Sequence, residues 1–133
     1  MRLLVDLNIL LDVLLDRAGR ETSAEIIRRC SGPDEGWIAW HTLATLAYFV
    51  AREDKKKVSA VVGGLLDWAR ISETGQAHAK LALQWDFKDF EDALQAAAAT
   101  ACKADFIITR NLKDFTKSPI PALSPEKYLG RHR

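Results

Sequence analysis

The sequence predicts an α/β protein in which a central parallel sheet of four to five strands lies between two layers of helices. Short apolar segments alternate along the chain with segments whose apolar residues recur at helical spacing. This alternation is typical of βαβ units, in which crossover helices cover both faces of a parallel sheet. The 133 residues show no internal repeat and no low-complexity linker, so we expect a single domain over residues 1–133.

The first half of the chain begins with the apolar run Arg2-Leu3-Leu4-Val5, which predicts a buried parallel strand that ends at Asp6. The aromatic and apolar composition of Gly36-Trp37-Ile38-Ala39-Trp40 predicts a second strand. Apolar residues at helical spacing fill the segments between and after these strands, and Gly32-Pro33 marks a helix end. We expect helices over residues 9–14, 21–30 and 42–52.

The second half contains an amphipathic helix over residues 58–69, in which Gly63-Gly64 weakens the helix unless close packing requires the missing side chains. The most helical stretch covers residues 89–102, where Asp89 is an expected N-cap. Ser124-Pro125 suits the start of a terminal helix, with Ser as the cap and Pro at the first helical position. The other expected elements are strands over residues 70–72, 105–109 and 122–123 and a helix over 76–83.

Composition predicts a soluble protein without a strong overall attraction for nucleic acid. Hydrophobic residues make up 48% of the chain, charged residues 28%, and the net charge is +1. An RNA-binding chain of this charge would need its basic residues on one face, with 28–29, 55–57 and 131–133 as candidates. Cys30 and Cys102 lie outside any CxxC spacing, which predicts free, buried thiols. The sequence shows neither a leader nor a membrane-spanning segment, so we expect a cytoplasmic protein.

Oxygen-bearing side chains follow two of the predicted strands, at the end where an open parallel sheet binds its ligands. They are Asp6 and Asn8 after the first strand, and Thr109, Asn111 and Asp114 after the strand over 105–109. Asp92, in the first turn of the helix over 89–102, can face the same end. An isolated Asp at a strand end is often only a cap or turn former. Several such side chains together would suit Mg²⁺ or Mn²⁺, which can activate a water and stabilise charge on a phosphodiester.

Three motifs in this order resemble the PIN-domain family. Leu4-Val5-Asp6-Leu7-Asn8-Ile9-Leu10 looks like the family's opening strand followed by Asp-Thr-Asn-Val. Residues 89–98 look like its later helix, in which an Asp is followed by a run of small residues. Residues 107–115 look like its closing strand and metal-side loop, and residues 118–125 fit a bacterial branch. The resemblance covers nearly the whole chain and implies a PIN-like, Rossmann-like domain with three α/β/α layers.

The resemblance also implies a metal-dependent endoribonuclease, often the toxin of a VapC-type toxin–antitoxin pair, that hydrolyses RNA with water activated by Mg²⁺ or Mn²⁺. The implied catalytic carboxylates are Asp6, Asp92 and Asp114. The implied metal ligands are Asp6, Asp92, Asn111 and Asp114. The residues implied to orient ligands or substrate are Asn8, Thr45, Asp89 and Thr109. The implied partners are RNA, an antitoxin protein and a second copy of the chain in a homodimer.

One position departs from the family pattern. Active members usually have a Glu in a Thr-x-x-Glu pattern after the second strand, and Thr42-Leu43-Ala44-Thr45 places Thr45 there. A hydroxyl is an uncharged and poorer ligand for Mg²⁺, so metal binding should weaken. Asp89 could supply the missing carboxylate or serve only as an N-cap, and His41 is another nearby candidate. The alternative is a catalytically degenerate PIN module that binds RNA or a protein partner without cleavage.

Other α/β families fit the sequence less well. A haloacid-dehalogenase-like phosphatase needs Asp-x-Asp after its first strand, whereas this chain has Asp6-Leu7-Asn8. The sequence also lacks the adjacent acids of a receiver domain and the Gly-rich phosphate loops GxGxxG and GxxxxGK[ST]. The four tryptophans could stack on RNA bases, although core or dimer packing is the expected role of Trp37, Trp40, Trp68 and Trp85.

Overall fold

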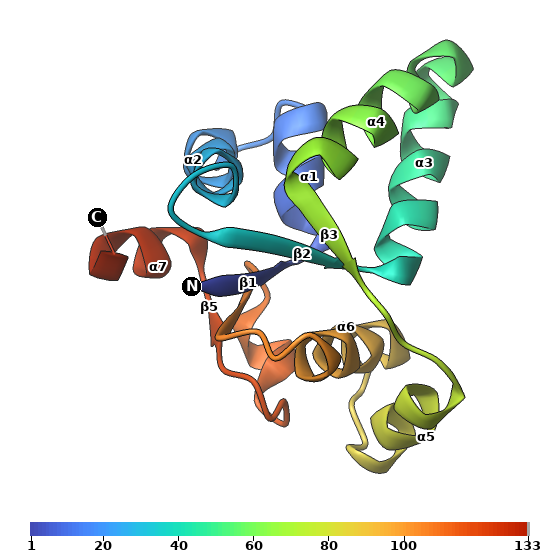
Figure 1. Ribbon diagram of the computed structural model, residues 1–133, viewed down its shortest axis with the longest axis vertical. Coiled ribbons are helices and arrows are strands. Elements are labelled where there is room, and N and C mark those ends of the chain that lie inside the picture. The colour runs from blue at the N-terminus through green and yellow to red at the C-terminus, as the bar shows by residue number, and fades with distance from the viewer. Residues whose placement is uncertain (133) are drawn as a thin grey trace.

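The computed structural model describes residues 1–132, and over this range it forms one five-stranded sheet (Figure 1). The strands are β1 (Arg2–Val5), β2 (Glu35–Ala39), β3 (Ala69–Ser72), β4 (Phe106–Ile108) and β5 (Ala122–Leu123). Their order is β3-β2-β1-β4-β5, and every neighbouring pair is parallel. The predicted parallel α/β fold is therefore confirmed, with β1 at the centre of the sheet.

Helices cover both faces of this sheet (Figure 1). One face carries α1 (Leu7–Leu14), α2 (Arg20–Cys30), α3 (Trp40–Asp54) and α4 (Val58–Trp68), and α7 (Pro125–His132) packs against α2. The other face carries α5 (Gln76–Gln84) and α6 (Phe90–Ala101). Two short 3₁₀ turns, η1 (Lys55–Lys57) and η2 (Leu112–Phe115), complete the described elements.

The apolar core is divided by the sheet, because successive side chains of a strand point to opposite faces. Leu3 and Val5 of β1 pack into the cluster under α1 to α4, whereas Leu4 between them packs with α6. The middle of α6 is an alanine run, and Ala96 and Ala99 are fully buried against the sheet. Side chains this small let the helix approach the strands closely. This close approach brings the first turn of α6 to the carboxyl ends of β1 and β2.

The structure differs from the sequence-based prediction mainly at element boundaries. Trp40 is the first residue of α3 rather than the last of β2, and its side chain is 65% exposed. Ala69 opens β3 instead of closing the preceding helix. Gly63 and Gly64 lie inside α4, and close packing does not require them, because an added Cβ at either would meet nothing within 4 Å. The turn η2 was not expected.

Two further expectations bear on the type of protein. Cys30 and Cys102 are free and buried, as predicted for small apolar residues in helices. Among residues 1–132, no helix is long and apolar enough to span a bilayer.

Candidate active site

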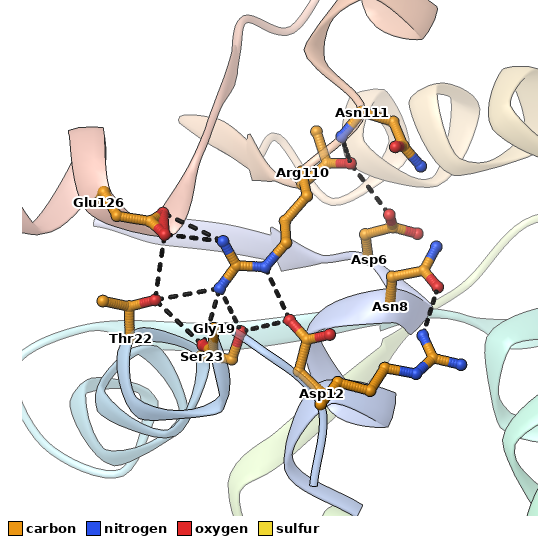
Figure 2. Close-up of polar contacts among 11 residues, drawn as sticks. Asp6, Asn8, Asp12, Gly19, Thr22, Ser23, Arg110, Asn111 and Glu126 are labelled. Atoms are coloured by element: carbon orange, nitrogen blue, oxygen red, sulfur yellow. Dashed lines mark hydrogen bonds and ion pairs between the residues drawn. The ribbon is translucent and has the colours of Figure 1, made fainter. Parts of the chain in front are cut away.

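The candidate site lies where β1 and β4 end side by side. Chain connections leave these two central strands in opposite directions along the sheet, which is the position where open α/β sheets bind ligands. The backbone N–H of Asp6 continues the ladder by donating to the carbonyl of Ile108 at 3.1 Å. The Thr109 hydroxyl then donates to Asp6 Oδ2 at 3.0 Å (Figure 2). The predicted meeting of the two strand ends is confirmed by this contact between residues 103 positions apart.

Asp6 carries a carboxylate in an unfavourable place for charge. It is only 4% exposed, and its hydrogen-bonding partners are neutral groups that include Thr109 and Asn8. Burial raises the pKa of Asp6, the hydrogen bonds from Thr109 and Asn8 lower it, and the nearby charge of Glu91 raises it further. The net shift is upward, and no cation is among the described groups that act most strongly on this carboxylate.

Asp92, on the opposite wall of the site, is a second carboxylate with a raised pKa. It lies in the first turn of α6 and is half-buried. Burial, followed by the negative charges of Asp89, Asp6 and Asp114, raises the pKa of Asp92 to about 7. The acidic residues predicted from distant parts of the sequence therefore lie within electrostatic reach of one another. Their mutual repulsion marks the end of the sheet at which a cation would be stabilised.

The other predicted site residues take several positions around this pair. Asn8 accepts a hydrogen bond from the Arg17 guanidinium at 3.3 Å. The Asn111 backbone N–H donates to the Thr109 hydroxyl at 3.1 Å, and Asn111 precedes η2, on which Asp114 is exposed. Thr109 therefore connects Asp6 directly to the loop that bears the predicted ligands.

Asp89, one of the two candidates for the missing acid, and Thr45, which stands at its position, are both engaged in hydrogen bonds within their own helices. Asp89 caps α6 by accepting from the Glu91 backbone N–H at 2.8 Å, which confirms its predicted N-cap role. The Thr45 hydroxyl donates to the carbonyl of His41 one turn earlier, at 3.1 Å. His41 itself has a pKa lowered by burial and partly restored by the charge of Glu91.

Sequence reasoning missed several polar residues at this end of the sheet. Glu91 was passed over, although its charge acts on Asp6, Asp92 and His41 together. Its place in the first turn of α6, next to Asp92, was the available signal. Arg110 was quoted only within a motif, yet its guanidinium bonds to Asp12 at 2.7 Å. No local pattern could have revealed that partner, because the two residues are 98 positions apart.

The donor chemistry at this site fits a hard divalent cation. The side chains that converge offer carboxylate, amide and hydroxyl oxygens, the ligands that Mg²⁺ and Mn²⁺ prefer. The surplus of negative charge that raises the pKa of Asp92 also favours a cation. Within residues 1–132, however, no three His, Cys, Asp or Glu side chains are close enough to hold a metal ion as they stand. Binding would therefore have to draw the carboxylates inward.

Comparison with models of known protein families identifies the family of this chain. A sequence model of the PIN domain matches residues 2–113, which include Asp6, Asp92 and Asn111. The chain belongs to the PIN-domain family. A comparison with curated protein sequences gives no significant match.

Solved structures share the fold of this PIN domain. VapBC2 from Rickettsia felis, bound to a DNA fragment from its promoter, matches at 18% identity with a TM-score of 0.70, over 93% of this chain and 98% of that one. VapBC-1 from nontypeable Haemophilus influenzae matches at 15% identity and a TM-score of 0.73, over 95% and 99%. FitAB bound to an IR36 DNA fragment matches at 14% identity and a TM-score of 0.67, over 92% and 94%. At these identities the likeness is one of fold.

Proposed function

We propose that this PIN domain is a metal-dependent endoribonuclease that hydrolyses RNA phosphodiesters. The observation that supports it most is the meeting of Asp6, Asp92 and Asp114 at the carboxyl ends of β1 and β4, where their charges repel. A purely structural group of acids would be paired with Arg or Lys, because burying unpaired charge costs stability. An excess of carboxylates at a ligand-binding position is the arrangement that a nuclease site needs.

Each residue has a distinct role in this proposal. Asp6 and Asp92 hold Mg²⁺ or Mn²⁺ from opposite walls, and Asn111 and Asp114 complete the set from the loop after β4. A divalent cation bound there supplies positive charge against the phosphate and a lowered pKa for a coordinated water. Thr109 fixes the orientation of the Asp6 carboxylate through its hydroxyl. Asn8, held by Arg17, is placed to orient substrate.

Glu91 offsets the missing family Glu in this proposal. Thr45 supplies no negative charge, and its hydroxyl proton is used within α3. Glu91 acts electrostatically on both Asp6 and Asp92, so its carboxylate restores one negative charge to the site. Burial and the neighbouring acids raise the pKa of Asp92 to about 7, which suits it to donate or accept a proton near neutral pH.

A pocket beside the acids, whose lining includes three lysines as well as three aspartates, offers a place for the RNA backbone. Asp89 and Asp114 of the candidate site form part of its lining, and the cations in the lining are Lys88, Lys113 and Lys117. The Lys117 ammonium is held in place by the carbonyl of Asp86 at 2.9 Å. Phosphates of a strand next to the cut position can pair with these lysines, which supplies local attraction despite the net charge of +1.

We further propose that the protein is the toxin of a VapC-type pair, held inactive by an antitoxin, and that it forms a homodimer. The structures of similar fold are VapBC and FitAB proteins. An apolar groove between α1, α2 and α4 is a suitable docking surface for the antitoxin, lined among others by Leu10, Val13, Leu14, Ile27, Leu65 and Trp68. Leu14 at 41% exposed leaves apolar surface that a partner would cover.

The alternative function is a PIN module that binds RNA or a protein without cleavage. Thr45 favours it, because the position where active members have Glu carries a hydroxyl that is bonded to its own helix. The two functions share the fold and differ in whether a metal binds and RNA is cut.

The deciding experiment is Mn²⁺ binding by calorimetry, with RNA cleavage measured on the same samples. Wild type is compared with Asp6→Asn, Asp92→Asn and the control Asp34→Asn, a buried carboxylate near the amino ends of the strands. The nuclease proposal expects wild type and the control to bind metal and cut RNA, and the two site variants to do neither. Intact RNA and no binding at millimolar Mn²⁺ in wild type would leave the degenerate module.

A further inference from the structure

Arg110, in the loop after β4, makes several hydrogen bonds to residues far from it in the sequence (Figure 2). It stands between Thr109, which bonds to Asp6, and Asn111, a proposed metal ligand. Thr109 bonds to Asp6 in the site, whereas the Arg110 side chain bonds to residues of α1, α2 and α7. Figure 2 shows the guanidinium directed toward Asp12, Ser23 and Glu126.

The partners of this guanidinium come from three separate elements. Its Nε donates to Asp12 on α1 at 2.7 Å, and one terminal nitrogen donates to Glu126 on α7 at 2.7 Å. The other terminal nitrogen donates to groups at the start of α2: the Gly19 carbonyl at 2.8 Å and the hydroxyls of Thr22 and Ser23, each at 3.0 Å. A planar fork of five N–H donors is required for such a set, and lysine cannot reproduce it.

The surface that receives Arg110 includes buried side chains and a glycine that makes room for the guanidinium. Asp12 is 4% exposed and accepts a second hydrogen bond, from the buried Ser23 hydroxyl at 2.8 Å. Gly19 has a left-handed φ of 88°, and an added Cβ there would lie 2.7 Å from the Arg110 guanidinium. Glycine is therefore required at this position both for its backbone angle and for the approach of the arginine.

We propose that Arg110 is a positioning residue that sets the loop after β4, and with it Thr109 and Asn111, against Asp6. The inference rests on the proposed function, because it assigns to Arg110 the placement of the metal ligands. The guanidinium ties the loop to α1, and Asp6 immediately precedes α1. The same two segments are thus joined twice, once through Thr109 and Asp6 and once through Arg110 and Asp12. Two attachments on opposite sides of the loop fix its rotation as well as its distance.

A second ion pair in the protein provides a matched control. Arg29 Nε bonds to Asp34 Oδ2 at 2.7 Å, the same atoms and distance as Arg110 and Asp12. The side-chain exposures also match, at 21% and 3% for Arg29 and Asp34 against 27% and 5% for Arg110 and Asp12. This second pair lies beside the amino ends of the strands, away from the candidate site. If Arg110 contributed only to folding stability, substitutions at Arg110 and at Arg29 would have the same effects on the loop and on Mn²⁺ binding.

The experiment compares Arg110→Ala and Arg110→Lys with Arg29→Ala and Arg29→Lys, and adds Gly19→Ala as a change that disturbs the contact while keeping the arginine. Urea unfolding identifies variants that are folded. Hydrogen exchange of the Asn111 amide, which bonds to Thr109, reports the loop without any metal. Calorimetry of Mn²⁺ binding reports whether the proposed metal ligands are still correctly placed.

We expect Arg110→Ala to speed exchange of the Asn111 amide about tenfold and to weaken Mn²⁺ binding about tenfold or more, with Arg110→Lys and Gly19→Ala between it and wild type. Both Arg29 variants should leave both readouts within about twofold of wild type, whatever stability they lose. Equal changes at Arg110 and Arg29, or none at Arg110, would overturn the proposal. If wild type binds no Mn²⁺, the proposed function fails, and the Asn111 amide alone still decides whether Arg110 holds the loop.

Discussion

The two ends of the sheet hold buried aspartates in opposite ways. Near the amino ends, Asp34 is 8% exposed and bonds to Arg29 at 2.7 Å and to the N-terminal amine at 3.3 Å. Burial alone would raise the pKa of Asp34, but the neighbouring Tyr128 hydroxyl, Arg29 and the amine outweigh it and hold the pKa below its usual range. At the carboxyl ends, Asp6 is equally buried, its bonds come from neutral groups, and burial raises its pKa.

This difference is the one expected between a structural acid and a functional acid. A buried carboxylate with a cation beside it contributes to folding, whereas one without a cation costs stability that the rest of the fold must offset. Residues that cost stability and remain in a ligand-binding position are typical of functional sites. The partners of a buried aspartate therefore indicate whether it is structural or functional, and the sequence alone does not reveal those partners.

The largest expected effect is at Asp6. Asp6→Asn should weaken Mn²⁺ binding more than about 100-fold, beyond the usual effect of residues outside the first ligand shell, and should abolish RNA cleavage. Removal of a charge whose burial raises the pKa of Asp6 should at the same time raise the free energy of unfolding. Calorimetry and urea unfolding measure the two quantities. A variant that loses stability and still binds Mn²⁺ would contradict the assignment.

The same substitution should have the opposite effect on stability at the other end. Asp34→Asn leaves Arg29 and the N-terminal amine without their carboxylate, and should lower the free energy of unfolding by about 2–3 kcal/mol. Mn²⁺ affinity should remain within about twofold of wild type, because the residue lies away from the site. The comparison between the ends fails if both Asn variants change stability in the same direction.

The raised pKa of Asp92 predicts that both the stability of the fold and the Mn²⁺ affinity of the site depend on pH. Its pKa is raised to about 7, so folding favours the protonated form. Its contribution to stability is fully present below about pH 4 and is lost as the pH rises through about 7. Mn²⁺ needs the charged form, so affinity should fall by up to about tenfold per unit below pH 7. Calorimetry between pH 5.5 and pH 8 tests this, and an Mn²⁺ affinity that stays constant over this range would contradict it.

Asp34 should respond to pH in the other direction. Its pKa is lowered, so its contribution to stability is present above the usual value of 3.8 and is lost as the pH falls through the depressed value. Acid unfolding followed by circular dichroism should therefore begin at higher pH in Asp34→Asn than in wild type. Identical acid transitions would show that the pair with Arg29 contributes little.

The smallest expected effect concerns the missing family acid. Thr45→Glu adds a carboxylate one helical turn after His41 and should tighten Mn²⁺ binding by about fivefold, because ligand charge sets affinity for hard cations. RNA cleavage should rise with it, while Thr45→Val should stay within about twofold of wild type. Inactive wild type together with active Thr45→Glu would identify the chain as a degenerate PIN module that one substitution restores.

Much of the fold was predictable because its signals are local. The strand ending at Asp6 and the helix capped by Asp89 were both recognised from a few neighbouring residues, and both are present. Trp40 was assigned to the wrong element because an aromatic residue after an apolar run reads as a continuing strand, while the helix start depends on the residues that follow. Whether close packing requires Gly63 and Gly64 was left open by the sequence, and in the described chain both face open space.

The candidate site was predictable where parallel strands bring their ends together, as for Asp6 and Thr109. It was not predictable where the partners come from helices. Arg110 reaches Asp12, Ser23 and Glu126, which are 98, 87 and 16 positions away. Such contacts follow from the packing of α1, α2 and α7 and leave no periodicity or spacing in the sequence.

The bond between Asp6 and Thr109 also determines when the site can exist during synthesis. The two residues are separated by 103 positions, and Glu126, which holds Arg110, follows later still. A chain made from its N-terminus displays Asp6 early but lacks β4 until most residues have been joined. Contacts between such distant residues form slowly, because a long loop must close before they stabilise anything. The acidic centre is therefore among the last features of the newborn chain to assemble.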